Sequence, residues 1–146
     1  MNVTRRPATD ADTPFAREAH HGAYREAVER QFGQWDEARQ DLLFARDWAD
    51  AQFDVIELDG VPCGYACIEE RDADFHVREI VVHPHFQGRA IGTAVLRETQ
   101  ERARARNVPV HLGTFLTNRA AELYRRLGFQ ETGRTESHIL MEWRPR

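Results

Sequence analysis

The sequence predicts one mixed α/β domain. Apolar residues recur at helical spacing through the first fifty residues, and runs typical of β-strands follow them. A polar stretch with two glycines, residues 83–92, then connects a β-branched run to an amphipathic helix, which is the strand–loop–helix arrangement of mixed folds. A chain of 146 residues is long enough for one domain with a sizeable core.

The N-terminal third predicts a short strand and two helices. Residues 2–9 form the strand, and Thr13-Pro14 is typical of a helix N-cap followed by proline at the first helical position. Phe15, Ala19, Ala23 and Ala27 give this first helix an apolar stripe, and Gly33 interrupts it. A second helix is predicted from apolar residues at spacings of three and four, namely Trp35, Ala38, Leu42, Ala45 and Ala49.

The middle of the chain predicts three strands. Residues 53–58 and 61–70 flank Asp59-Gly60, and this dipeptide accepts the positive φ angles of a tight hairpin turn. A turn at residues 71–74 leads into a longer strand over residues 75–83. The sequence therefore predicts a hairpin followed by a third strand.

The C-terminal third predicts two more helices and further strands. The period becomes helical from Gly88 or Ala90 onward, and proline in residues 107–109 ends that helix. Residues 108–115 predict a short buried strand. Residues 117–128 predict a capped helix whose Gly128 is placed for a left-handed C-terminus, and residues 130–143 supply the closing strands.

Charge and hydropathy argue against two classes of partner. The formal net charge is −4 and the pI is near 6.0, so no global basic field favours nucleic acid. No run approaches the roughly 20 apolar residues of a membrane span. Cys63 and Cys67 lie on one face of one predicted strand, about 13 Å apart, which is too far for a disulfide. We therefore expect reduced cysteines and a cytoplasmic protein.

The loop at residues 83–92 is a candidate phosphate site. A helix N-terminus leaves four N–H groups without intrahelical partners and carries a partial positive charge. Gly88 and Gly92 keep side-chain bulk low there, while Gln87 and Arg89 add donors. The alternative is a helix start that needs glycine only for the turn. The spacing matches neither a Walker A loop nor the dinucleotide-binding G-x-G-x-x-G pattern.

Two motifs resemble the GCN5-related N-acetyltransferase (GNAT) family. Residues 80–96, "IVVHPHFQGRAIGTAVL", look like its acetyl-CoA-binding signature. The second signature is matched by Ala120, Leu123, Tyr124, Gly128 and Phe129. The resemblance implies a single N-acetyltransferase domain over residues 1–146. Its fold would be a mixed, mostly antiparallel sheet of six to seven strands flanked by about four helices, with a splayed parallel strand pair at the cofactor site.

The resemblance also implies an activity. The family transfers acetyl from acetyl-CoA to a primary amine of a small molecule, peptide or protein by direct attack in a ternary complex. No metal, nucleic acid or membrane is expected to take part. Members of the family are often dimers, so a homodimer is one expected oligomeric state. By this resemblance the cofactor-binding residues are Ile80, Val81, Val82, Gln87, Gly88, Arg89, Ala90, Ile91, Gly92, Thr93 and Asn118.

Two positions depart from the family pattern. Ala90 occupies the first glycine slot of the phosphate loop, and an alanine is acceptable there if the backbone is near helical, since only positive φ demands glycine. The asparagine that usually opens the late helix aligns with Thr117, one residue before Asn118. Either residue can cap that helix and meet the cofactor.

The resemblance assigns Tyr124 as general acid, because a phenol keeps its proton at neutral pH and can pass it to the departing thiolate. Glu79 is the candidate general base, and the alternative is a carboxylate paired with Arg78. The fallback bases are His83, His85 and His111.

Acceptor selection is expected from the first two helices. Their aromatic residues Tyr24, Trp35 and Phe44 are the candidate substrate contacts, while Asp36, Glu37 or Asp41 would attract a cationic amine. The alternative for each aromatic residue is core packing. A non-catalytic CoA-binding regulatory module is the other function that the motifs allow, and a nucleotide-binding protein is a third.

Overall fold

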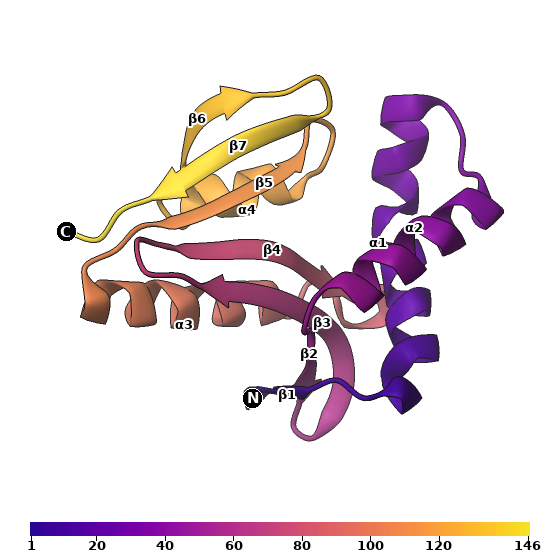
Figure 1. The fold of residues 1–146 in the computed structure, drawn as a ribbon, viewed down its shortest axis with the longest axis horizontal. Coiled ribbons are helices and arrows are strands. Elements are labelled where there is room, and N and C mark those ends of the chain that lie inside the picture. Colours follow the sequence, from indigo (N-terminus) through magenta and orange to yellow (C-terminus); the bar gives the residue numbers. More distant parts are fainter. The chain divides into compact units, whose positions relative to one another are not determined.

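The computed structural model describes residues 1–146 and contains seven strands and four α-helices (Figure 1). The strands follow the order β1-β2-β3-β4-β5-β7-β6, and only β4 and β5 pair in parallel. The predicted fold class is confirmed. The elements are β1 Val3–Pro7, α1 Thr13–Phe32, α2 Glu37–Asp50, β2 Asp54–Leu58, β3 Val61–Glu70, β4 Phe75–Val82, α3 Ile91–Arg106, β5 Val110–Phe115, α4 Ala120–Arg126, β6 Gln130–Arg134 and β7 His138–Trp143, with short 3-10 turns at Asp10–Asp12 and Pro84–Phe86.

The chain divides into two compact units. The first comprises residues 1–67 and 79–92, and therefore holds β1, α1, α2 and β2. The second comprises residues 68–78 and 93–146, and holds β5, α4, β6, β7 and most of α3. Strands β3 and β4 contribute residues to both units.

The first unit begins with the antiparallel strands β1, β2 and β3. Asp59 and Gly60 both have positive φ, 51° and 84°, so the predicted hairpin turn is confirmed. Helix α1 starts one residue earlier than predicted, because Asp12 is its N-cap and Thr13 its first residue. The Asp12 carboxylate accepts hydrogen bonds from Arg6, which lower its pKa to about 2.

Aromatic residues form the core of the first unit. Phe44 of α2 is 4% exposed, and the Trp48 ring stacks between Phe44 and Phe53 at centroid distances of 5.5 and 4.7 Å. The predicted apolar face of α2 is therefore wrong. Leu42 is 74% exposed, and the alanines of that stripe, Ala38, Ala45 and Ala49, are exposed as well.

The second unit is organised around β5. This strand pairs antiparallel with β7, and β7 pairs antiparallel with β6. Its parallel ladder with β4 joins Phe75–Val77 to Val110–Leu112. The guanidinium groups of Arg102 and Arg106 on α3 each lie 5.4 Å from the centre of the buried Phe75 ring. Gly128 has φ 96°, so the predicted left-handed end of α4 is confirmed.

Both cysteines are buried free thiols, as predicted. Cys63 donates to the carbonyl of Ile56, and burial raises the pKa of its thiol to about 11. No helix in the structure combines the length and the apolar character needed to cross a membrane.

Candidate active site

The predicted site residues belong to both units. Glu79, the end of β4 and the loop up to Gly92 are in the first unit, whereas Asn118 and Tyr124 are in the second.

His83 anchors the start of the loop between β4 and α3. Its backbone N–H donates to the Cys63 carbonyl at 2.8 Å, and its Nδ1 accepts from the His85 N–H at 3.1 Å. Because Nδ1 is an acceptor, Nε2 carries the hydrogen and donates to Glu18 Oε1 at 3.0 Å. The whole residue is 8% exposed. The sequence interpretation named His83 as a fallback base. Here both of its ring nitrogens are engaged in hydrogen bonds, so the side chain has a structural role.

The loop beyond His83 is exposed from Gln87 to Ala90. Gly88 has φ 80°, and a Cβ there would meet nothing within 4 Å, so this backbone faces open space. The Gln87 side-chain amide donates to the Val82 carbonyl at 3.0 Å, which ties the loop to the end of β4. No acidic side chain lies in the first turn of α3. An exposed loop that leads into a helix N-terminus without a competing carboxylate suits an anion.

Ala90 has a left-handed backbone with φ 60°. The condition under which alanine was acceptable, a near-helical backbone, is therefore not met. A left-handed conformation costs a residue with a Cβ roughly 1–2 kcal/mol. Ala90 thus introduces strain at the step from the loop into α3.

Ala90→Gly should raise the free energy of unfolding by up to about 1 kcal/mol, because glycine relieves the strain and loses part of that gain to its unfolded-state entropy. Denaturant titration measures it. Ala94→Gly in the α3 interior is the matched control and should lower stability by a similar amount. If Ala90→Gly and Ala94→Gly destabilised the protein equally, Ala90 would not be strained.

Residues Ile80, Val81 and Val82 end β4, with Val81 buried and its neighbours half-buried. A Cβ on Gly64 of β3 would collide with the Val81 carbonyl oxygen. The close approach of the two backbones therefore requires glycine at position 64. This contact sets the position of the strand end that the family resemblance assigns to the cofactor.

Gly64→Ala should destabilise the protein by about 2–3 kcal/mol, because the added methyl group meets backbone and not a movable side chain. Thermal and denaturant unfolding measure the loss. Gly133→Ala on β6 is the matched control, since its Cβ meets only Leu140 at 3.9 Å. A Gly64 variant as stable as this control would show that β3 and β4 have room to separate.

Glu79 lies half-buried in β4. Its neighbour Tyr65 is a residue that the sequence interpretation did not single out. Tyr65 on β3 is 0% exposed, and Glu79 is the carboxylate that its buried hydroxyl faces. Burial, and secondly the nearby Glu79 charge, raise the pKa of Tyr65 well above its ordinary value. The only sequence signal was a tyrosine within the small, apolar run of β3.

Tyr124 lies on the short helix α4. The residue as a whole is half-buried. Burial of its hydroxyl raises the pKa of Tyr124 to about 12, so the phenol is protonated at neutral pH. Its ring meets Phe129 edge-on at 6.0 Å. Asn118 Oδ1 accepts a hydrogen bond from the Ala120 N–H at 2.9 Å, so the Asn118 side chain caps the helix.

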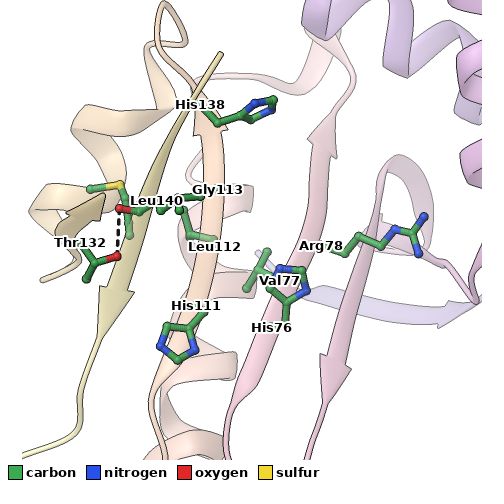
Figure 2. A pocket seen from close by; sticks show the side chains of 10 residues that line it. His76, Val77, Arg78, His111, Leu112, Gly113, Thr132, His138 and Leu140 are labelled. Atoms are coloured by element: carbon green, nitrogen blue, oxygen red, sulfur yellow. Dashed lines mark hydrogen bonds between the residues drawn. The ribbon is translucent and has the colours of Figure 1, made fainter. Parts of the chain in front are cut away.

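A cavity of about 440 Å³ lies in the second unit, where the parallel ladder ends (Figure 2). Arg78 and Gly113, the residues after the last paired positions, both line it. Figure 2 shows Leu112 directed toward β4. Three histidines contribute to the walls, together with aliphatic side chains. The full lining is His76, Val77, Arg78, His111, Leu112, Gly113, Thr132, His138, Leu140 and Met141.

His111, another fallback base, is held between two carboxylates. Its Nδ1 lies 2.6 Å from Asp74 and its Nε2 lies 2.8 Å from Glu142. Burial lowers the pKa of His111, but these two hydrogen bonds and charges outweigh it, and the net shift is upward. The pKa of Asp74 falls to about 2, mainly through Arg71. With both nitrogens engaged, His111 joins strands and does not serve as a base.

His111 predicts a pH dependence of stability. Its pKa is raised above the unfolded value of 6.5, so its contribution is complete below that pH and is lost as pH rises through the folded pKa. Because the side chain is 35% exposed, we expect a loss of at most about 1 kcal/mol. Unfolding at pH 6 and pH 9 measures it, with His111→Gln as the reference. An equal pH dependence in this variant would assign the effect to other groups.

The candidate acceptor residues lie within the first unit. Tyr24 and Trp35 are half-buried, whereas Phe44 is inside the aromatic core. The His20 ring lies between two of them, 4.9 Å from Tyr24 and 5.4 Å from Phe44, whereas Trp35 contacts His21. Burial lowers the pKa of His20 to about 4, so it is neutral at pH 7. The sequence interpretation missed His20, although adjacent histidines on a helix were a visible signal.

The profile of the Acetyltransferase (GNAT) family matches residues 20–129. An uncharacterized N-acetyltransferase of Methanocaldococcus jannaschii is 42% identical over 90 residues, which are 54% of this chain and 39% of that protein. The N-acetylaspartate synthetase of Danio rerio is 36% identical over 92 residues, 60% of this chain and 33% of that protein. The matched part thus spans well under half of these curated relatives.

A solved structure shares the fold over almost the whole chain. The PaiA N-acetyltransferase of Thermoplasma acidophilum, in complex with coenzyme A, superposes with a TM-score of 0.67 at 16% identity, covering 99% of both chains. Because the family profile covers most of the sequence, including the β4–α3 loop and α4, the family is shown. The chain belongs to the acetyltransferase (GNAT) family.

Proposed function

We propose that residues 1–146 act as one domain that transfers the acetyl group of acetyl-CoA to a primary amine by direct attack. One observation carries the cofactor assignment: the exposed loop Gln87–Ala90 leads into the N-terminus of α3 with no acidic side chain in its first turn. Free amide hydrogens and the helix dipole favour a diphosphate there. The coenzyme A complex of a protein with this fold supports the same cofactor.

The residues present fit the coenzyme. The backbone of Gln87–Gly92, with Thr93 after it, would bind the diphosphate, and Arg89 adds a cation whose side chain lies over the Phe86 ring at 5.4 Å. The backbone of Ile80, Val81 and Val82 would bind the pantetheine arm. Asn118 is assigned by its motif position, although its side chain also caps α4. When bound, the coenzyme supplies an activated thioester.

Three events make up the reaction. The Glu79 carboxylate accepts a proton from the acceptor ammonium, directly or through a water molecule. The neutral amine then forms a bond to the thioester carbonyl carbon, the nitrogen releases its second proton to solvent, and the carbon–sulfur bond breaks. Tyr124 donates its proton to the departing thiolate and recovers one from solvent. A phenol pKa of about 12 keeps that proton in place before the step.

The acceptor is a primary amine of a small molecule or of a peptide or protein. Tyr24 and Trp35 reach solvent between α1 and α2, with acidic residues beside them that attract a cation. Phe44 is 4% exposed and would contribute only by packing against His20 and Trp48. The Danio rerio relative is named for acetylation of an amino acid, which supports the small-molecule branch.

A panel of amines tests the proposal. Free coenzyme A thiol is measured after incubation of the full chain with acetyl-CoA and, in turn, amino acids, diamines and peptides with free N-termini. We expect release that depends on one acceptor class and exceeds the slow hydrolysis without acceptor. Binding of acetyl-CoA with no acceptor-dependent release across the panel would favour a non-catalytic CoA-binding module.

A further inference from the structure

Gly22 lies in the middle of α1, where glycine is an unfavourable residue. Glycine in a helix interior costs about 1 kcal/mol relative to alanine. The structure shows what requires it: a Cβ at position 22 would lie 2.7 Å from Cγ and 3.0 Å from Cδ of Pro84. Helix α1 therefore packs directly against the 3-10 turn Pro84–Phe86. Both segments belong to the first unit.

This turn cannot make room for an added methyl group without moving its backbone. Cγ and Cδ of Pro84 belong to a ring that closes on the backbone nitrogen and fixes φ. The preceding residue is held as well, because the His83 backbone N–H donates to the Cys63 carbonyl of β3 at 2.8 Å. A larger residue at position 22 would therefore displace the turn beyond this anchor.

Two further residues of α1 contact the same segment. The Phe15 ring stacks on the His83 imidazole at a centroid distance of 5.8 Å. The Glu18 carboxylate accepts from His83 Nε2 at 3.0 Å, although its side chain is 71% exposed and the contact adds little energy. Phe15, Glu18 and Gly22 are spaced by three and four residues, so one face of α1 contacts the start of the loop.

The turn leads into the candidate diphosphate loop. The Phe86 N–H donates to the His83 carbonyl at 2.8 Å, and the Arg89 guanidinium lies over the Phe86 ring at 5.4 Å. Gln87, the first residue of the loop, follows the turn directly. A displaced turn therefore moves both the loop backbone and the cation that would bind the diphosphate.

We propose that Gly22 is a positioning residue for coenzyme binding: its lack of a side chain lets α1 set the place of the diphosphate loop through Pro84. The inference rests on the proposed function, because it concerns the coenzyme of that reaction. Gly22 acts through the turn and is assigned no contact with the coenzyme. The competing explanation is a glycine needed only for packing, and it predicts a change in stability alone.

Gly22→Ala should lower the affinity for acetyl-CoA about tenfold, because the loop is no longer aligned with the diphosphate. The affinity for acetyl-pantetheine, which lacks the diphosphate, should stay nearly unchanged, since β4 precedes the anchored His83. Calorimetry with both compounds on the full chain measures the ratio of affinities. Alanine favours the helix by about 1 kcal/mol, which offsets part of the strain in folding. A melting curve of each variant verifies the fold.

Pro84→Ala supplies the compensating change, since it removes the ring atoms that the new methyl group would meet. The double variant Gly22→Ala/Pro84→Ala should bind acetyl-CoA as tightly as Pro84→Ala alone. Gly133→Ala on β6, whose Cβ meets only Leu140 at 3.9 Å, is the matched control and should bind as the parent does.

The outcomes separate this inference from the proposed function. Parental affinity for acetyl-CoA in folded Gly22→Ala, an equal loss for both compounds, or no recovery in the double variant would overturn the role of Gly22 and leave the proposed function standing. A folded parent that binds no acetyl-CoA would overturn the proposed function and this inference together.

Discussion

Replacement of Tyr124 by phenylalanine should lower kcat by about 10²- to 10⁴-fold while acetyl-CoA affinity changes less than twofold. The ring and its contact with Phe129 remain, and only the hydroxyl is lost. A pKa of about 12 makes this phenol a proton donor at neutral pH, so its removal leaves the thiolate to depart without a proton. Steady-state kinetics and calorimetry of acetyl-CoA binding measure the two quantities.

The acyl donor provides the control for this variant. An acetyl thioester of a more acidic thiol needs less help on departure, so Tyr124→Phe should lose much less rate with such a donor than with acetyl-CoA. An equal loss with both donors would assign Tyr124 a packing role in α4. Normal turnover of acetyl-CoA by the variant would remove the residue from the mechanism.

Glu79→Gln should lower the rate at neutral pH by about 10²- to 10³-fold, because the acceptor ammonium loses its base. The deficit should shrink as pH rises above the pKa of the acceptor amine, since solvent then removes the proton. The pH–rate profile from pH 6 to 10 measures this convergence. A profile that is unchanged from the parent would exclude Glu79 as the base.

A variant of Tyr65, the neighbour of Glu79, provides the comparison for Glu79→Gln. The Tyr65 hydroxyl is buried next to the Glu79 carboxylate, and that charge raises the pKa of Tyr65 further than burial alone, so the two residues share one environment. A Tyr65→Phe variant that keeps the parent's pH–rate profile would show that the carboxylate acts without this neighbour. The stability of each variant separates loss of folding from loss of the base.

Local patterns predicted most of the elements. The Asp59-Gly60 turn and the Gly128 helix end follow from backbone preferences within a few residues, and both were confirmed. The buried face of α2 was wrong for a physical reason. Two overlapping stripes were present, and the aromatic stripe of Phe44 and Trp48 buries far more area than a stripe of alanines with one leucine.

The candidate site also has a part that the sequence predicted and a part that it did not. Its loop and Tyr124 are contiguous motifs, so the sequence was sufficient to propose them. The left-handed Ala90, by contrast, depends on how β4 and α3 are joined, and the residue type predicted the opposite. Clusters such as His111 with Asp74 and Glu142 bring together residues far apart in the chain, and only the folded structure shows them.

Calorimetry with acetyl-CoA and with acetyl-pantetheine, which lacks the diphosphate, tests the central claim most directly. If the loop Gln87–Gly92 binds the diphosphate, acetyl-CoA should bind the folded chain with one equivalent, and acetyl-pantetheine should bind at least 100-fold more weakly. Equal affinity for both compounds, or no binding of acetyl-CoA by the folded chain, would contradict the account.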